Sequence, residues 1–290
     1  MTVMKRALVL SGGGAAGQAW LLGVISGLRK LGADLGEADL IVGTSAGARA
    51  GAQLATGVLD QAVEALSRGQ LPVAEVYATL PQFVAASMRI IAGSPNEREA
   101  ARRIANMGPL GSQLASGAGR RQQVAAQLPV TDWPRQRLLI TAVDAESGER
   151  AVFDAHSGAD LADAVTASGA LPGIYPLVTI NGRCYADGGV HSLYHADLAA
   201  GHEVVVILSP MPVSDYTQAQ LEAETAGLGP AAIRIITPDQ HALAAIGPDA
   251  NSPAAIPAAL RAGTAQARQE VGTLTPHWQS GRDSTGGSNE

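Results

Sequence analysis

Short apolar runs alternate with stretches of helical periodicity in the first fifty residues. Residues 6–11 and 40–42 are apolar runs closed by glycine, which is typical of buried strands. Between them, apolar side chains recur at helical spacing over residues 18–31, and a second helix is predicted to open at Thr44-Ser45. This β-α-β-α order with short connections predicts a parallel, buried sheet covered by helices.

The middle of the chain has a different pattern. Residues from about 60 to 127 form Ala-rich segments with helical spacing, broken by prolines at positions 72, 81, 95 and 109. We interpret this region as a helical insertion or cap within one domain. The stretch 71–91 carries many of its apolar residues, which ordinary core packing would explain.

Strand patterns resume after the insertion. Apolar runs predict strands at 137–143, 150–153, 177–180, 184–186, 204–208 and 234–236, and helices at 161–168 and 252–271. Asn181-Gly182 marks a hairpin between two of these strands. The sequence thus predicts a three-layer αβα fold with a mainly parallel central sheet. We expect one domain over residues 1–279 and a disordered polar tail over 280–290.

Composition narrows the range of partners and compartments. The formal net charge is −6, and no cluster of Lys or Arg exceeds two residues, which argues against a nucleic-acid surface. Cys184 is the only cysteine, so an internal disulfide and a zinc-cysteine site are excluded. The apolar run after Lys5-Arg6 is too short for a signal peptide, and no apolar stretch reaches the roughly 20 residues that span a bilayer. We expect a cytoplasmic protein with at most transient contact with a membrane surface.

A G-x-S-x-G turn directly follows the second predicted strand. It consists of Gly43, Thr44, Ser45, Ala46 and Gly47, and hydrolases use such a turn between strand and helix to expose a nucleophilic serine. A β-carbon at either glycine would crowd the turn and the following helix. The helix N-terminus is expected to direct its N–H groups toward Ser45. Plain strand–helix turns share this pattern, so other motifs must support it.

A glycine-rich loop over residues 12–17 follows the first predicted strand and satisfies G-x-G-x-x-G. Dinucleotide-binding proteins combine this pattern with an acidic residue after the second strand, which holds the ribose. Here Asp39 precedes that strand and the serine turn follows it. The N–H groups of Gly12, Gly13 and Gly14 would equally suit a developing oxyanion. A nucleotide- or phosphate-binding protein is therefore the alternative to a hydrolase.

A nucleophilic serine needs a base, and the sequence offers two kinds. Asp187, followed by Gly188 and Gly189, ends a predicted strand, a position where Asp-Gly-Gly is also a common turn. The histidines are His156, His191, His195, His202, His241 and His277. Only the last two fit the chain order of a Ser-His-Asp triad, so a triad esterase is a second alternative. His191 and His195 lack a recognisable third metal ligand, and we expect no metal and no cofactor.

Together these motifs resemble the patatin-like phospholipase family. The resemblance covers residues 5–208 and depends on four stretches in a specific order and spacing. These are residues 10–17 (LSGGGAAG), 42–47 (VGTSAG), 167–177 (ASGALPGIYPL) and 185–190 (YADGGV). Each motif is weak alone, whereas the ordered set is highly specific.

The resemblance implies a function and a set of site residues. Ser45 would be the nucleophile and Asp187 the base of a Ser-Asp dyad that requires no histidine. Gly12, Gly13 and Gly14 would donate the oxyanion hole, and the remaining motif glycines, Gly17, Gly43, Gly47, Gly188 and Gly189, would shape the turns. The implied reaction is hydrolysis of a lipid carboxylic ester, of phospholipase A or acyl hydrolase type, through an acyl-enzyme. Because a carboxylate is a poor base for a hydroxyl in water, the site must be partly desolvated.

Two departures from the family pattern bear on the substrate. Ala16 occupies a position where members commonly carry Arg or Lys, and the segment after Gly189 lacks the usual Asn and Pro. Both departures affect a phospholipid substrate more than hydrolysis itself, and a catalytically idle relative is a further alternative. Under the same resemblance, the apolar stretch 71–91 is a candidate acyl-chain groove or lid, with ordinary core packing as the alternative. The Arg102-Arg103 and Arg120-Arg121 pairs could contact anionic head groups, although solvated helix faces are the commoner role of such pairs.

Overall fold

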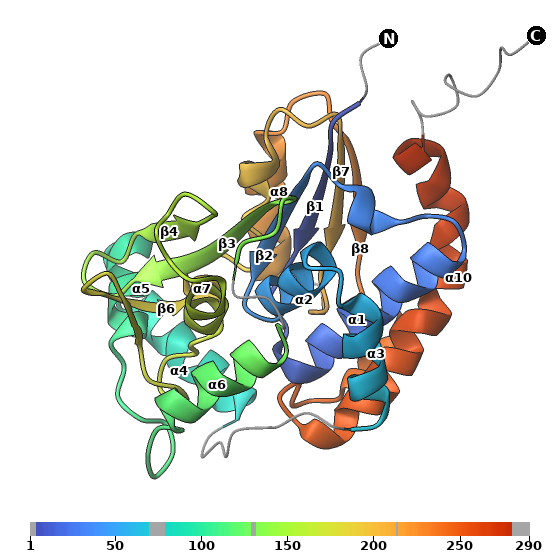
Figure 1. Cartoon of the computed structure of the whole chain (residues 1–290). Helices are drawn as coiled ribbons and strands as arrows, with labels where there is room; N and C mark the ends of the chain where they lie inside the picture. Colours follow the sequence, from blue (N-terminus) through green and yellow to red (C-terminus); the bar gives the residue numbers. More distant parts are fainter. Residues whose placement is uncertain (1–3, 70–78, 129–131, 213, 280–290) are drawn as a thin grey trace, which may run out of the picture.

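The computed structural model describes residues 4–69, 79–128, 132–212 and 214–279. Their strands form one sheet in the order β5-β6-β3-β2-β1-β7-β8, with β4 paired to β3 (Figure 1). The bounds are β1 Arg6–Leu10, β2 Leu40–Thr44, β3 Arg137–Asp144, β4 Arg150–Phe153, β5 Val178–Ile180, β6 Arg183–Asp187, β7 Val204–Leu208 and β8 Ala232–Ile236. Five strands (β1, β2, β3, β7 and β8) are parallel, and β4, β5 and β6 add antiparallel pairs at one end.

The helices are α1 Gly14–Lys30, α2 Ala46–Ala55, α3 Leu59–Ser67, α4 Leu80–Ala92, α5 Glu97–Ala105, α6 Gly117–Ala126, α7 Leu161–Ser168, α8 Asp215–Ala226, α9 Gln240–Ile246 and α10 Ile256–Gln279. Figure 1 shows α1, α3 and α10 together beside the sheet. Short 3₁₀ turns at Gly188–Val190 and Ala196–Ala199 follow β6.

Both faces of the central strands are buried, which produces the predicted three layers. Leu8 and Leu10 of β1 belong to the large core that includes α1, α2, α7 and α10. Ala7 and Val9, which point to the opposite face, belong to a smaller core with Tyr194 and with Leu221 of α8. The fold class predicted from the sequence is therefore confirmed.

Helices α1 and α10 pack closely against each other, and glycines permit this approach. A β-carbon at Gly23 would overlap the carbonyl oxygen of Leu260. The indole N–H of Trp20 donates to Gln266 Oε1 at 3.1 Å in the same interface. Since α1 begins at the glycine-rich loop, its packing against α10 fixes the position of that loop.

Several element boundaries differ from the sequence prediction. Helix α1 begins at Gly14 inside the glycine loop, and the closing helix α10 runs over Ile256–Gln279 instead of 252–271. Helices α8 and α9 were not predicted, because α8 is mostly polar and exposed and α9 is only one to two turns long. Within the predicted insertion, α3 packs on α1 and α10, while α5 packs on β3 and β6 and α6 on α7. The predicted tail 280–290 lies outside the described residues.

Within the described ranges, no helix combines the length and the apolar character needed to cross a bilayer.

Candidate active site

Ser45 occupies a sharp turn between β2 and α2. Its backbone has φ 54° and ψ −113°, a conformation with positive φ that a serine adopts only when its surroundings impose it. A β-carbon at Gly47 would overlap the carbonyl oxygen of Leu10, and one at Gly43 would lie 2.6 Å from Ala48 Cα. The Ser45 N–H donates to Ser168 Oγ at 2.9 Å. Close backbone packing at the two glycines and the hydrogen bond to Ser168 thus hold the turn in place, as the G-x-S-x-G pattern predicts.

Asp187 lies at the end of β6 and meets Ser45. Its Oδ2 accepts a hydrogen bond from Ser45 Oγ at 2.7 Å, and its Oδ1 accepts from the Gly189 N–H at 2.8 Å. The residue is only 1% exposed. Burial raises the pKa of Asp187 from 3.8 to about 6, although the hydrogen bonds from Ser45 and Gly189 and the charge of Arg120 oppose the shift. The carboxyl is therefore ionised at neutral pH and is a stronger base than an exposed aspartate.

The glycine-rich loop lies beside the serine. A β-carbon at Gly12 would be 3.5 Å from Ser45 Cβ. The Gly12 N–H is already used, since it donates to the Leu193 carbonyl at 3.3 Å. The N–H groups of Gly13 and Gly14 form no hydrogen bond within the described part of the chain. Of the three glycines expected to donate to an oxyanion, the second and third thus have the free donors.

A buried arginine from α6 borders the same space. Arg120 is 5% exposed, and it donates from Nη1 to the Thr166 carbonyl and from Nη2 to the Gly169 carbonyl, both at 2.6 Å. Its guanidinium carbon lies 4.3 Å from the centre of the Tyr175 ring. A β-carbon at Gly169 would be 2.6 Å from Arg120 Nη2 and 3.9 Å from Ser45 Oγ. A side chain at this position would therefore displace the guanidinium, so glycine allows Arg120 to lie close to the serine turn.

A second arginine, Arg49, lies one helical turn after Ser45 on α2. Its Nη1 is 3.4 Å from Gln18 Oε1, and its buried Nε has no hydrogen-bond partner among the described residues. Burial and the neighbouring charge of Arg120 lower the pKa of Arg49 to about 10. No ion pair joins either arginine to a carboxylate within the described ranges. Two cations therefore lie close to the site although Ala16 supplies none.

The paired arginines of the sequence have different roles. Arg121 forms an ion pair with Asp163, and Arg102 and Arg103 both form ion pairs with Glu99. These three arginines lie on solvated helix faces, which is the commoner role of such pairs. For Arg120 that interpretation is wrong, because the side chain is buried. Arg49 was not predicted as a site residue, and Arg120 was named only as one of a pair that could contact anionic head groups. Arg49 could have been suspected, since i and i+4 positions share a helix face, whereas nothing local to Arg120 indicates its destination.

The histidines occupy other positions. His195 is fully buried, its Nε2 bonds the Gly188 carbonyl at 3.1 Å, and burial lowers its pKa to about 3. His191 stacks on His195 with ring centroids 5.5 Å apart. His241 is exposed on α9, and the side chain of His277 lies outside the described residues. Among the described histidine side chains, none forms a hydrogen bond with Ser45 or Asp187.

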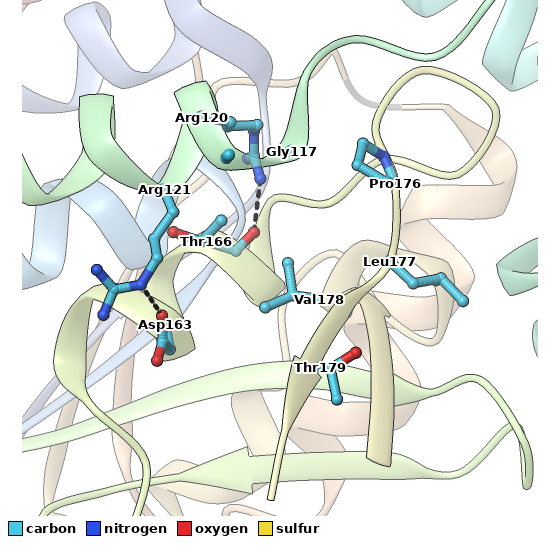
Figure 2. Close-up of a pocket in the computed structure, with 10 residues that line it drawn as sticks. Gly117, Arg120, Arg121, Asp163, Thr166, Pro176, Leu177, Val178 and Thr179 are labelled. Atoms are coloured by element: carbon cyan, nitrogen blue, oxygen red, sulfur yellow. Dashed lines mark hydrogen bonds and ion pairs between the residues drawn. The ribbon is translucent and has the colours of Figure 1, made fainter. Parts of the chain in front are cut away.

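A cavity of about 300 Å³ lies between α6, α7 and β5 (Figure 2). Arg120 is part of its wall, with Pro176, Leu177 and Val178 on the opposite side, and Ser45 is not among its lining residues. The described part of the predicted groove, residues 79–91, does not line this cavity. Residues 71–78 lie outside the described ranges, and the remainder lies in α4, where Val84 and Met88 are 44% and 47% exposed. The described part of that stretch is therefore not ordinary core.

The described residues contain no cluster of three or more His, Cys, Asp or Glu side chains suited to a metal ion. β2 also continues into Ser45 through Thr44, without the acidic residue that a ribose would require.

The glycine loop, the serine turn and Asp-Gly-Gly occur together in a known protein family. The sequence model of the patatin-like phospholipase family matches residues 8–200, which include all of these motifs. The chain belongs to this family. The resemblance predicted from four motifs is thereby confirmed, and the patatin-like domain extends through β1, β2, β3 and β6. No curated protein sequence matches the chain.

Solved structures with a similar arrangement are distant in sequence. VipD from Legionella pneumophila is 15% identical with a TM-score of 0.47, and the match covers 94% of this chain and 67% of VipD. ExoU in its complex with SpcU from Pseudomonas aeruginosa is 19% identical with a TM-score of 0.40, covering 92% and 52%. An acyltransferase domain of a phenolphthiocerol synthase from Mycobacterium bovis is 14% identical with a TM-score of 0.37, covering 81% and 98%. The chain thus spans about half the length of ExoU.

Proposed function

We propose that this patatin-like chain hydrolyses carboxylic esters of lipids, with Ser45 as nucleophile and Asp187 as general base. The observation that carries the proposal is the 2.7 Å hydrogen bond from Ser45 Oγ to the buried Asp187 Oδ2. The positive φ of Ser45 supports it, because strain of this kind accumulates at functional turns. Membership of a phospholipase family supports a lipid ester as substrate.

The reaction follows from the two side chains. Ser45 Oγ attacks the ester carbonyl carbon while its proton moves to Asp187 Oδ2, so that a C–O bond forms and the carbonyl oxygen becomes an oxyanion. Collapse of this intermediate breaks the ester C–O bond, and the leaving alcohol takes the proton from Asp187. Water then attacks the acyl-enzyme in the same way and releases the fatty acid. Ser45 and the Asp187 carboxylate are both restored.

The oxyanion needs donors that are in place before the reaction. The free N–H groups of Gly13 and Gly14, at the N-terminus of α1, are the proposed donors. The Gly12 N–H bonds Leu193 in the free protein, so its proposed role is to hold the loop against the serine turn. Loss of one such donor typically lowers kcat by about 10²–10³-fold in serine hydrolases.

We also propose that the described chain acts as one hydrolase unit and that α4 touches the lipid surface. The exposed apolar side chains of Val84 and Met88 support transient contact with lipid.

The test is hydrolysis of short and medium p-nitrophenyl esters in EDTA by wild type, Ser45→Ala and Asp187→Asn. Both variants should lose activity by several orders of magnitude, and EDTA should have no effect. Asp163→Asn, which changes a half-buried carboxylate paired with Arg121, is the matched control and should retain activity. Activity that survives Asp187→Asn would assign the base to a histidine. A wild type that cleaves neither these esters nor lipid vesicles would contradict the proposed function.

A further inference from the structure

The peptide unit between Gly188 and Gly189 connects the candidate dyad to a buried histidine. Its N–H, which belongs to Gly189, donates to Asp187 Oδ1 at 2.8 Å. Its carbonyl, which belongs to Gly188, accepts a hydrogen bond from His195 Nε2 at 3.1 Å. Because a trans peptide points its N–H and its carbonyl in opposite directions, a side chain that holds the carbonyl also directs the N–H.

We propose that His195 is a positioning residue that, by holding the Gly188 carbonyl, orients the Asp187 carboxylate. The Gly189 N–H then occupies Oδ1 of that carboxylate and leaves Oδ2 for Ser45. This inference rests on the proposed function and adds to it a residue that acts through the main chain and takes no part in proton transfer.

Two consecutive glycines leave this peptide with little restraint of its own. Glycine populates both signs of φ, so a peptide between two glycines can rotate between orientations. Close packing nevertheless requires both glycines. A β-carbon at Gly188 would lie 2.5 Å from Thr141 Oγ1, and one at Gly189 would lie 3.1 Å from Asp187 Oδ1. The peptide therefore needs partners outside the two glycines to fix its orientation.

Three donors converge on the Gly188 carbonyl, and only one of them is a side chain. The main-chain N–H groups of His191 and Ser192 lie 3.1 and 3.2 Å from the oxygen. The imidazole of His195 adds a third donor from beyond the 3₁₀ turn. Donors to the carbonyl also polarise the peptide and so strengthen the N–H at its other end. His195 is thus the one donor that a substitution can remove.

The surroundings of His195 keep its ring neutral, with the proton on Nε2. The side chain is fully buried, and burial lowers its pKa to about 3. A carbonyl accepts only from a protonated nitrogen, which assigns the hydrogen to Nε2. Nδ1 lies 3.5 Å from Arg150 Nη1, and Arg150 also donates to Asp197 Oδ1 at 2.7 Å. The remaining titratable neighbour is His191, whose ring stacks on it. Loss of the imidazole therefore removes a hydrogen bond and no charge.

The segment that supplies His195 is the one that departs from the family pattern after Asp-Gly-Gly. Its backbone at His195 is left-handed, with φ 54° and ψ 37°, which is uncommon outside glycine. The N–H groups of Tyr194 and His195 both donate to Ser192 Oγ, at 3.0 and 3.2 Å, and Ser192 donates to Glu224 of α8. These contacts hold the conformation that returns the imidazole to the dyad.

The first arm of the test compares two amides that differ in reach. Gln places its amide nitrogen near the position of Nε2, whereas Asn places it near Nδ1, so only His195→Gln still reaches the Gly188 carbonyl. Asn, however, tolerates a left-handed backbone better than Gln does. If the histidine only supported the backbone, His195→Asn would be the more active variant. If it positions the dyad, His195→Gln is the more active one.

We expect His195→Asn to lower kcat for a p-nitrophenyl ester by about tenfold, the effect of one hydrogen bond, with little change in KM. His195→Gln should remain within about threefold of wild type. His202→Asn is the matched control and should keep the wild-type kcat, because its ring bonds the Ala199 carbonyl at 2.9 Å in a different turn. A loss in His195→Gln that equals or exceeds the loss in His195→Asn would overturn the inference.

The second arm follows the Asp187 carboxyl by NMR without turnover. The protein is labelled with ¹³C at aspartate carboxyls, and Asp187→Asn identifies the resonance. A donated hydrogen bond favours the ionised carboxylate, so a weaker bond from Gly189 raises the pKa of Asp187. We expect the titration midpoint to rise in His195→Asn and to return toward the wild-type value in His195→Gln. Arg120, whose charge acts on Asp187, is present in every variant. Equal midpoints in all of them would overturn the inference.

Wild type alone provides a further check that does not depend on how the variants fold. Nitrogen NMR of the histidine rings should show His195 neutral at pH 7 with its proton on Nε2. A proton on Nδ1 would overturn the inference, because Nε2 could then not donate to the Gly188 carbonyl.

The two arms separate this inference from the proposed function. If wild type cleaves no ester but the Asp187 midpoint responds to His195 as expected, the positioning contact stands and the hydrolase function fails. If wild type cleaves esters and His195→Asn matches it in kcat and in midpoint, the hydrolase stands and the positioning role is overturned.

Discussion

The burial of Asp187 determines how the candidate dyad should respond to pH. A general base must be ionised to accept a proton, and the pKa of this carboxyl is raised to about 6 by burial. We predict that kcat/KM for a neutral ester rises with pH through an apparent pKa near that value and then reaches a plateau. A pH–rate profile from pH 4 to 8 with a non-ionisable ester measures it. A profile centred on the ordinary pKa of an exposed aspartate would contradict this description of the site.

The same burial makes Asp187 a source of instability. Because its pKa is about 6 in the folded protein and 3.8 in the unfolded chain, the folded state binds the proton more tightly. Its favourable contribution is therefore complete below pH 3.8 and is lost as pH rises through 6, a difference on the order of 3 kcal/mol. We predict that Asp187→Asn gains more stability relative to wild type at pH 8 than at pH 4.5. Urea unfolding of both proteins at the two pH values tests this, and an equal difference at both would refute it.

Ser168 is expected to act through Ser45 without touching the substrate. Its Oγ accepts the Ser45 N–H at 2.9 Å and so helps to hold the positive φ of the turn. We predict that Ser168→Ala lowers kcat by about tenfold with little change in KM, since the turn relaxes while the binding surface remains. Thr166→Val is the matched control on α7, because its hydroxyl bonds only the Ala162 carbonyl of the same helix. Equal losses in both variants would indicate general damage to α7.

At the scale of elements, glycine spacing controls how α1 and α10 pack. A β-carbon at Gly23 would overlap the Leu260 carbonyl, whereas one at Gly272 of α10 would meet nothing within 4 Å. We predict that Gly23→Leu destabilises the protein by about 3 kcal/mol or more, because backbone must move. Gly272→Ala should instead add about 0.5–1 kcal/mol by favouring the helix. Thermal unfolding measures both, and a neutral Gly23→Leu would show that the helices can separate at no cost.

The elements also show how much of the structure can be predicted from the sequence alone. Strand β1 and the serine turn are local features, since an apolar run closed by glycine and the small-residue pattern after β2 identify them directly. The buried position of Arg120 depends on α6 packing against α7, residues more than forty positions apart, and no local pattern encodes that contact. Helix α8 escaped prediction because its apolar face is short: only Thr217 and Leu221 are buried. Long-range packing thus determines features of the structure that the hydrophobic periodicity of the sequence does not specify.

At the scale of the whole molecule, the packed structure extends further along the chain than the region that matches the family. The matched region stops at residue 200, but α10 covers α1, whose N-terminus carries the glycine-rich loop. Trp278 is fully buried, its indole N–H donates to the Asp34 carbonyl at 2.7 Å, and its ring lies 5.2 Å from the Arg6 guanidinium. The last helix is therefore joined to the first strand of the sheet. This supports one folding unit over the described chain instead of a patatin-like core with an appendage.

We therefore predict that a fragment of residues 1–237, which keeps every strand of the sheet and the whole matched region, does not fold cooperatively. Removal of α9 and α10 exposes Trp20 and the glycine face of α1, an apolar surface that the rest of the chain cannot cover. Urea unfolding followed by circular dichroism should give one sharp transition for the full chain and none for the fragment. A synthetic peptide of residues 250–279, added in excess, should restore the transition, since it supplies the same contacts in trans. A fragment that unfolds cooperatively by itself would place the boundary of the hydrolase unit before α9.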